Sequence, residues 1–168
     1  YSIAIGQGEV NLTPIQIANL AAQISNRGWF YPPHIVKEIE QGQLDSIYTH
    51  KKQTLIDSKY YDAIIRGMHG AVNGGTCLGA KIDSINVCGK TGTAQNRGED
   101  HSIFMGFAPM EKARIAISVY VENGGFGARW AVPIGGLMME KYLKGRIPEN
   151  RKWVEDKMIN GTVKVYGF

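Results

Sequence analysis

The sequence of 168 residues predicts an α+β fold, in which helices pack on a mainly antiparallel sheet. Three stretches with strand character follow one another through short links, which favours antiparallel neighbours. Three further stretches carry helix-capping signals or the helical spacing of apolar residues. The hydrophobic fraction of 43% and the 21 glycines indicate a folded chain with many tight turns, not a disordered one.

The first predicted helix begins at Pro14. Thr13 can cap it, Pro14 suits its first turn, and Gln16 lies where a capping box places its glutamine. Residues 15–24 are apolar on nearly every side of this helix, which predicts that it is buried. Gly28 can supply the left-handed turn that ends it.

An extended segment over residues 29–40 and a second helix over about 58–73 follow. The helix is indicated by apolar residues that recur on one face, namely Tyr61, Ile64, Ile65, Met68 and Val72. Asn73-Gly74-Gly75 is expected to end it.

Three predicted strands occupy about residues 85–95, 102–108 and 114–122. In the last of them apolar residues alternate with small or polar ones, as in a half-buried strand. A polar turn over residues 96–100 joins the first two strands, and residues 109–112 form the hairpin that joins the last two.

The glycine-rich stretch 123–127 lacks the spacing of a phosphate-binding loop, so it reads as the turn that leaves the third strand. A third helix is predicted over residues 131–144, with Ile134, Leu137, Met138 and Leu143 in the packing and Met138-Met139 as core filler. The chain becomes polar after Gly145. The expected organisation is therefore a domain portion over residues 1–145 and a loosely attached C-terminal tail over 146–168.

The motif that carries chemistry is Lys90-Thr91-Gly92-Thr93, on the first predicted strand. Lys-Thr-Gly is one of three sequence elements of penicillin-binding proteins and class A β-lactamases, the others being S-x-x-K and S-D-N. Lys90 can place a positive charge beside a carboxylate, Thr93 can offer a hydroxyl, and Gly92 leaves room for a substrate backbone against the strand. The main chain near Thr93 can donate an N–H to a developing oxyanion. Alone, the tripeptide could equally be a charged strand edge that prevents aggregation.

The surroundings of this motif resemble the transpeptidase domain of class B penicillin-binding proteins over about residues 1–145. Four landmarks in order carry the resemblance: residues 2–18, residues 89–95, the hairpin from His101 to Pro109 with residues 122–125, and residues 130–134. The last of these is similar to the elongation-type penicillin-binding protein 2 group.

The resemblance implies a β-lactamase/transpeptidase-like fold, here incomplete, and a peptidoglycan D,D-transpeptidase that works through a serine acyl-enzyme and binds β-lactams. It implies that Lys90, Thr91, Gly92 and Thr93 line the acyl-donor site, with Lys90 as the catalytic lysine of the third motif. Gly6, Gln7 and Gly8 are expected to be architectural. No cofactor and no metal are expected.

The sequence departs from the family in one respect, because none of its serines has a lysine three residues further on. The S-x-x-K nucleophile is therefore expected outside this chain, and the chain alone is expected to be inactive. Ser84-Ile85-Asn86 matches S-x-N, but it lies just before Lys90 on the same strand and reads as a coincidence. Cys88 stands where the family often has a small residue, a role that a buried thiol can fill.

Two other functions stay open: a non-catalytic module for interaction or sensing, and a β-lactamase-like hydrolase. The resemblance further implies that the parent protein acts in cell-wall elongation on the extracytoplasmic side, anchored in the inner membrane by an N-terminal helix that is not in this chain. Its implied partners are peptidoglycan stem peptides, β-lactam antibiotics, and the glycosyltransferase and scaffold proteins of the elongation machinery, with no nucleic acid.

The net charge of +4 comes from scattered basic residues, which fits a solvated surface or attraction to an anionic polymer or membrane. Cys77 and Cys88 could be free buried thiols or could pair as a disulfide.

Overall fold

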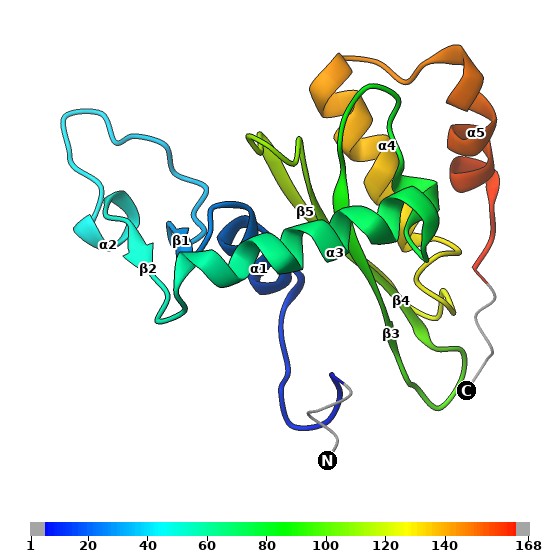
Figure 1. Cartoon of the computed structure of the whole chain (residues 1–168), viewed down its shortest axis with the longest axis horizontal. Helices are drawn as coiled ribbons and strands as arrows, with labels where there is room; N and C mark the ends of the chain where they lie inside the picture. Colours follow the sequence, from blue (N-terminus) through cyan, green and yellow to red (C-terminus); the bar gives the residue numbers. More distant parts are fainter. Residues whose placement is uncertain (1–5, 164–168) are drawn as a thin grey trace.

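A three-stranded antiparallel sheet forms the centre of the computed structural model, which describes residues 6–163. The strands are β3 (Cys88–Ala94), β4 (His101–Ala108) and β5 (Ile115–Val121), in the order β3-β4-β5 (Figure 1). Thr91 lies opposite Phe104, and Thr93 opposite Ser102. The α+β prediction is confirmed.

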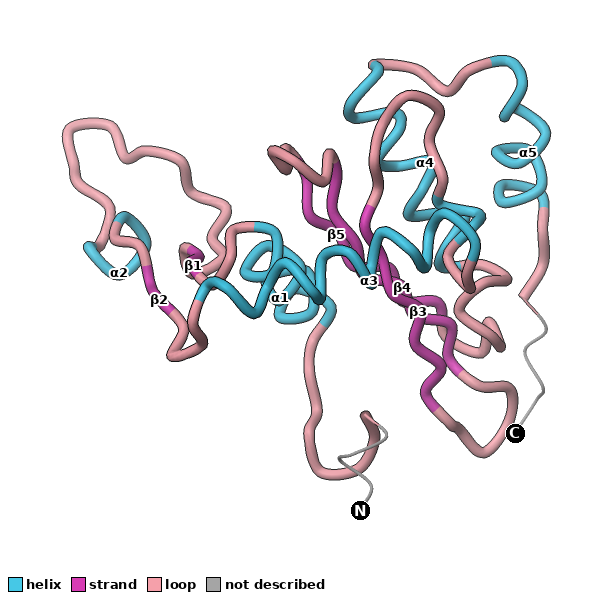
Figure 2. The backbone as a smooth tube through the Cα atoms, in the orientation of Figure 1, coloured by secondary structure: helices cyan, strands magenta, loops and turns pink. Residues whose placement is uncertain are grey.

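Helices cover both faces of this sheet. On one face, α4 (Ala131–Lys144) packs on β4 and β5 over a core that includes Phe104, Val119 and Met139. On the other face, α1 (Pro14–Ser25) and α3 (Tyr61–Gly74) enclose a second cluster around Ile65, Cys88 and Phe107 (Figures 1 and 2). Alternate residues of each strand serve these two cores because successive side chains point to opposite faces.

The side chain of Phe104 occupies a slot formed by three glycines. A Cβ atom added to Gly89, Gly106 or Gly135 would lie 2.5 to 2.7 Å from the nearest atom of the Phe104 ring. Since a methyl group does not fit there, these glycines let β3, β4 and α4 approach the ring closely.

The strands, their polar turn and their hairpin lie where the sequence predicts them; the first and third strands are shorter than predicted, and the second is one residue longer. The first strand begins at Cys88, because Ile85 makes only an isolated bridge with Ile82 and does not continue the ladder. The second begins at His101, and the third covers Ile115–Val121.

The predicted start of the first helix is confirmed, but its full burial is not. The side-chain oxygen of Gln16 accepts a hydrogen bond from the N–H of Thr13 at 2.8 Å, which is one half of the capping box. Ile15 is 59% exposed and Leu20 is 39% exposed, whereas Ala21 and Ile24 are buried. The expectation was wrong because only one side of α1 packs on β4 and β5 within the described residues.

The extended segment predicted over residues 29–40 is mostly irregular. Only Trp29–Phe30 (β1) is a strand, paired with Lys52–Gln53 (β2). A short helix, α2 (Ser46–Thr49), comes between the two strands in the sequence and lies beside β2 (Figure 2). Pro32 and Pro33 lack the N–H groups that a longer ladder would need.

The second helix is confirmed as α3, preceded by a single 3₁₀ turn over Ser58–Tyr60. Tyr61, Ile65, Met68 and Val72 are buried as predicted, whereas Ile64 is 46% exposed. Ile64 lies next to Ile65 on the helix, and the 100° step between neighbours turns it away from the core.

The third helix has the predicted bounds, but only one of its two methionines is core filler as expected. Met138 is 54% exposed and Met139 is fully buried, because neighbouring positions on a helix face different directions. The segment after Gly145 also differs from the expected loose tail. It forms a 3₁₀ turn over Glu149–Arg151 and the helix α5 (Lys152–Asn160), which packs against α4. The domain boundary at residue 145 stays a prediction.

Within residues 6–163, no helix combines the length and the apolar character needed to cross a bilayer.

Candidate functional site

The K-T-G strand is β3, which lies at one edge of the sheet. Its single strand partner in the described part of the chain is β4, so the opposite side of β3 carries no ladder (Figure 1). The helix α3 covers the start of the strand, where His69 Nδ1 lies 3.1 Å from the carbonyl oxygen of Val87. An uncovered strand edge can accept an extended peptide as an added strand.

The four residues of the motif divide between the two faces of the strand. Lys90 and Gly92 share the face of Cys88, whereas Thr91 and Thr93 share the face of Phe104 and Ser102, as the register requires. Lys90 is exposed, and its Nζ donates to the carbonyl oxygen of Thr91 at 2.8 Å. The structure thus places an exposed ammonium group and two hydroxyls along one short stretch of the edge.

Two segments distant in sequence hold the hydroxyls in place. The Oγ1 atoms of Thr76 and Thr91 lie 3.0 Å apart, and the N–H of Gly127 donates to Thr93 Oγ1 at 3.4 Å. A Cβ atom on Gly127 would lie 2.7 Å from the carbonyl oxygen of Gly92 and 3.0 Å from Thr91 Cβ. The close approach of the 123–127 loop therefore requires glycine at this position.

Ser102, on β4, holds the same loop through hydrogen bonds. Its hydroxyl is buried and lies 3.1 Å from the carbonyl oxygen of Phe126 and 3.3 Å from that of Gly127, to either of which it can donate. It also accepts a hydrogen bond from the N–H of Ala131 at 3.1 Å, where α4 begins. Ser102 thereby ties β4 to the loop that contacts Thr93.

The sequence does not predict the contacts that three residues make near the motif, namely Thr76, Ser102 and Gly127. The sequence predicts residues 123–127 only as the turn that leaves the third strand, and it contains no signal that links Thr76 or Ser102 to β3. These contacts form only when residues separated by 15 to 34 positions meet in the fold.

The other sequence candidates lie apart from the motif. Gly6 and Gly8 adopt left-handed backbone angles, with φ of 75° and 94°, in the segment before α1. Asn86 donates to Glu111 Oε1 at 2.6 Å, beside the hairpin at the opposite end of the sheet. This hydrogen bond lowers the pKa of the Glu111 carboxyl below its usual value. The match of residues 84–86 to S-x-N thus lies away from the K-T-G residues.

Both cysteines are free and buried. Burial raises the pKa of the Cys88 thiol to about 12, and the thiol donates to the carbonyl oxygen of Ile65 at 3.6 Å. Burial also raises the pKa of Cys77. Both thiols are therefore protonated at neutral pH and act as small core groups.

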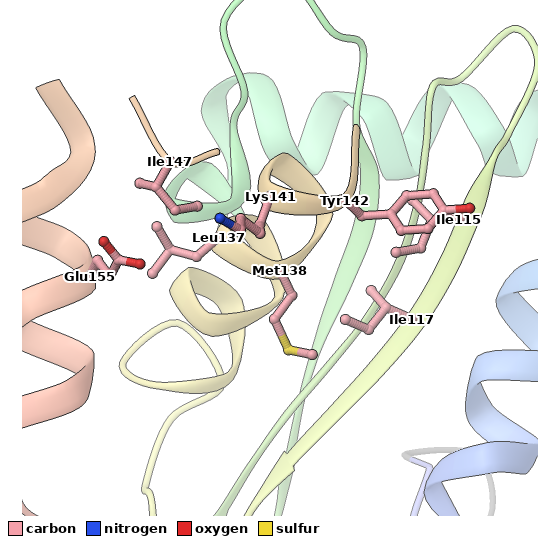
Figure 3. A pocket seen from close by; sticks show the side chains of 8 residues that line it. All are labelled: Ile115, Ile117, Leu137, Met138, Lys141, Tyr142, Ile147 and Glu155. Atoms are coloured by element: carbon pink, nitrogen blue, oxygen red, sulfur yellow. The ribbon is translucent and has the colours of Figure 1, made fainter. Parts of the chain in front are cut away.

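An apolar hollow of about 500 Å³ lies between α4, α5 and the outer strand β5, away from the motif (Figure 3). Ile117 and Met138 line it, and its polar or charged lining residues are Lys141, Tyr142 and Glu155. None of the K-T-G residues lines this hollow.

Comparison with known proteins identifies this arrangement. The family model for the penicillin binding protein transpeptidase domain matches residues 1–140. The peptidoglycan D,D-transpeptidase MrdA of Haemophilus influenzae is 29% identical over 176 aligned residues, covering 90% of this chain and 27% of MrdA.

Solved structures of penicillin-binding proteins have the same fold. In the Pseudomonas aeruginosa penicillin-binding protein 2 complex with WCK 5153, the TM-score is 0.73 at 35% identity, over 88% of this chain and 34% of that one. For the imipenem acyl-enzyme of penicillin-binding protein A from Mycobacterium tuberculosis, the TM-score is 0.71 and the sequence identity 32%. The match covers 84% of this chain and 33% of that one. For the complex of penicillin-binding protein 2 with MreC from Helicobacter pylori, the TM-score is 0.66 and the sequence identity 26%. The match covers 86% of this chain and 27% of that one.

The chain spans about a third or less of the length of these relatives. The matched residues include the K-T-G strand, the loop over residues 123–127 and the α1 segment. By sequence and by fold, the chain belongs to the penicillin-binding protein transpeptidase domain family.

Proposed function

We propose that this chain supplies one wall of the acyl-donor site of a peptidoglycan D,D-transpeptidase. In this reaction a serine hydroxyl attacks the carbonyl carbon of the D-Ala-D-Ala bond and forms an ester. The terminal D-Ala leaves, and the acyl group then passes to the amine of a neighbouring stem peptide. β-Lactams acylate the same serine.

The observation that carries the proposal is the open edge of β3, with Lys90, Thr91 and Thr93 along it. The Lys90 ammonium attracts the substrate carboxylate, and the hydroxyls of Thr91 and Thr93 donate to it. Gly92 leaves the strand surface free for the extended substrate backbone, and the N–H near Thr93 stabilises the oxyanion.

The reacting serine belongs to sequence outside this chain, since no serine here has a lysine three residues on. The chain alone is therefore inactive in this proposal. The test compares the chain with the protein that carries both this chain and an S-x-x-K segment, each incubated with a fluorescent penicillin. Labelling is expected only in the second sample, and stoichiometric labelling of the isolated chain would contradict the proposal.

A lysine substitution separates this function from the alternatives. In the serine-containing protein, Lys90→Met is expected to slow penicillin acylation by about a hundredfold, the scale of a lost charge-assisted contact of ~3 kcal/mol. Lys112→Met is the matched control, because Lys112 is an exposed lysine in the hairpin beyond β4. Equal rates for both variants would favour a non-catalytic interaction or sensing module. Rapid hydrolysis of a chromogenic β-lactam would favour a β-lactamase-like enzyme.

The resemblance to the elongation-type penicillin-binding protein 2 group supports a proposed cellular setting. We place the parent protein on the extracytoplasmic side of the inner membrane, held by an N-terminal helix outside this chain. The complex of penicillin-binding protein 2 with MreC from Helicobacter pylori supports a scaffold protein as partner. A glycosyltransferase is the second proposed partner, and cell-wall elongation the process.

A further inference from the structure

Arg151 connects the C-terminal segment to a turn that lies beside the K-T-G strand. Its Nη2 donates to the carbonyl oxygen of Gly79 at 3.1 Å, and its Nη1 donates to the carbonyl oxygen of Lys81. The Arg151 side chain is only 13% exposed, although it lies 70 residues from Lys81 in sequence. The planar guanidinium group is suited to holding two carbonyl oxygens at once.

A buried carboxylate holds the guanidinium group in this position. Glu140 of α4 is 1% exposed, and its Oε2 lies 3.2 Å from Nη1 of Arg151. Its Oε1 accepts a hydrogen bond from Lys144 Nζ at 3.0 Å. Because an uncompensated buried charge is costly, Glu140 strongly favours the conformation in which Arg151 lies against it.

The turn to which Arg151 donates its hydrogen bonds is closely packed. It is the 3₁₀ turn η3 (Leu78–Ala80), in which the N–H of Ala80 donates to the carbonyl oxygen of Cys77 at 2.9 Å. The helix α4 packs against this turn, and a Cβ atom on Gly136 would come within 2.7 Å of Ala80 Cα. A displacement of the Gly79 and Lys81 carbonyls is therefore transmitted along the turn to the residues just before it.

Thr76 is the residue where this turn meets the proposed site. It lies one position before Cys77, which is fully buried, and its hydroxyl is 3.0 Å from that of Thr91. A continuous path of contacts thus runs from Glu140 through Arg151 and η3 to Thr76 and Thr91.

We propose that Arg151 is a positioning residue for the K-T-G strand, which it acts on through η3 and the Thr76–Thr91 hydrogen bond. The proposal rests on the proposed function, because it assigns Arg151 a part in aligning the Thr91 hydroxyl for an acyl donor. It also gives the segment after Gly145 a role in the site, although within residues 6–163 this segment forms no hydrogen bond to β3.

The key comparison is between Arg151→Gln and Lys144→Gln. Both substitutions remove a positive charge from Glu140, but the described contacts of Lys144 do not include the turn. A general loss of stability from exposing Glu140 would therefore appear in both variants. Arg151→Lys is a milder variant that keeps the charge but cannot span both carbonyls.

The first measurement is the rate of acylation by a fluorescent penicillin, in the protein that carries this chain together with the S-x-x-K segment. It is made at a temperature where circular dichroism shows each variant to be folded. Arg151→Gln is expected to slow acylation by about tenfold, less than the ~100-fold that a 1 Å misplacement can cost. Lys144→Gln should stay within about twofold of the wild type, and Arg151→Lys should fall between them.

A double-mutant cycle with Thr76→Val tests the path itself. Valine keeps the shape of Thr76 and removes its hydroxyl, so this variant should slow acylation about as much as Arg151→Gln. If both act through the same hydrogen bond, the double variant should be no slower than either single one, whereas independent effects would multiply. Multiplying effects would refute the path.

Amide hydrogen exchange provides a readout that needs no enzymatic activity. Exchange at residues 76–81 and 90–93 should be about tenfold faster in Arg151→Gln than in Lys144→Gln, since local opening sets the rate. Unchanged exchange, or acylation within twofold of wild type, would overturn the positioning role. If the wild-type protein is not labelled by penicillin at all, the proposed function fails, and the exchange data then report only a structural link.

Discussion

Replacing Ser102 by alanine removes a β4 hydroxyl that forms hydrogen bonds with both the 123–127 loop and the start of α4. The Ser102 hydroxyl lies within hydrogen-bonding distance of two carbonyl oxygens and accepts from the N–H of Ala131. Ser102→Ala therefore perturbs three contacts with the loss of one atom. Little cavity forms, so the cost comes from the hydrogen bonds.

The magnitude depends on which partners can find a replacement. The carbonyl oxygen of Phe126 also accepts from the N–H of Arg129 at 2.9 Å, and that of Gly127 from the N–H of Val132 at 3.0 Å. Both acceptors keep a partner. Ala131 is fully buried, and its N–H loses the acceptor that Ser102 provides. One unsatisfied buried donor costs ~1–3 kcal/mol, so we expect a loss of about 2 kcal/mol.

Urea unfolding followed by circular dichroism measures this loss. With an m-value of about 2 kcal/mol/M, the midpoint should fall by about 1 M. Ser118→Ala on β5 is the matched control, because Ser118 Oγ is buried without a hydrogen-bond partner among the described residues. That substitution should be neutral or stabilising. Equal midpoints for the two variants would show that the hydrogen bonds of Ser102 do not carry the effect.

Three further predictions concern the two cores. Phe104→Ala should cost about 3–5 kcal/mol in urea unfolding, since the ring is fully buried between three glycines. Gly135→Ala should cost about 1–3 kcal/mol, because its Cβ would lie 2.5 Å from Phe104 Cδ1, and Phe104→Leu in the same chain should recover part of that loss. If the recovery is absent, the clash is not with Phe104. Cys88 has its pKa raised from 9.0 to about 12, so the folded state retains a proton that the unfolded state loses. Its contribution to stability is complete below pH 9 and falls between pH 9 and 12. The urea midpoint should therefore drop more steeply over that range in the wild type than in Cys88→Ala.

Local features of the fold follow well from the sequence. The Thr13-Pro14-Gln16 capping signal gave the start of α1, and the alternation over residues 115–121 gave β5. These predictions hold because a cap or a strand period depends on residues a few positions apart. The K-T-G motif was likewise found on a strand, as predicted.

Burial was less predictable, because it depends on which segments arrive from elsewhere. The apolar residues of α1 did not show that Ile15 would stay exposed, and Met138-Met139 did not show which methionine would enter the core. An apolar side chain favours burial, but how much of its surface is buried depends on which segments pack against it in the fold.

The sequence by itself determined the elements, their order and the chemical groups of the motif at Lys90–Thr93. Only the tertiary structure decided that β3 is an edge strand, that Gly127 and Thr76 contact its hydroxyls, and that Arg151 grips the neighbouring turn. Those contacts join residues that are 15 to 72 positions apart. The physical reason is that backbone preferences act over one or two turns of chain, while hydrogen bonds and buried charges require partners that only the folded chain brings together.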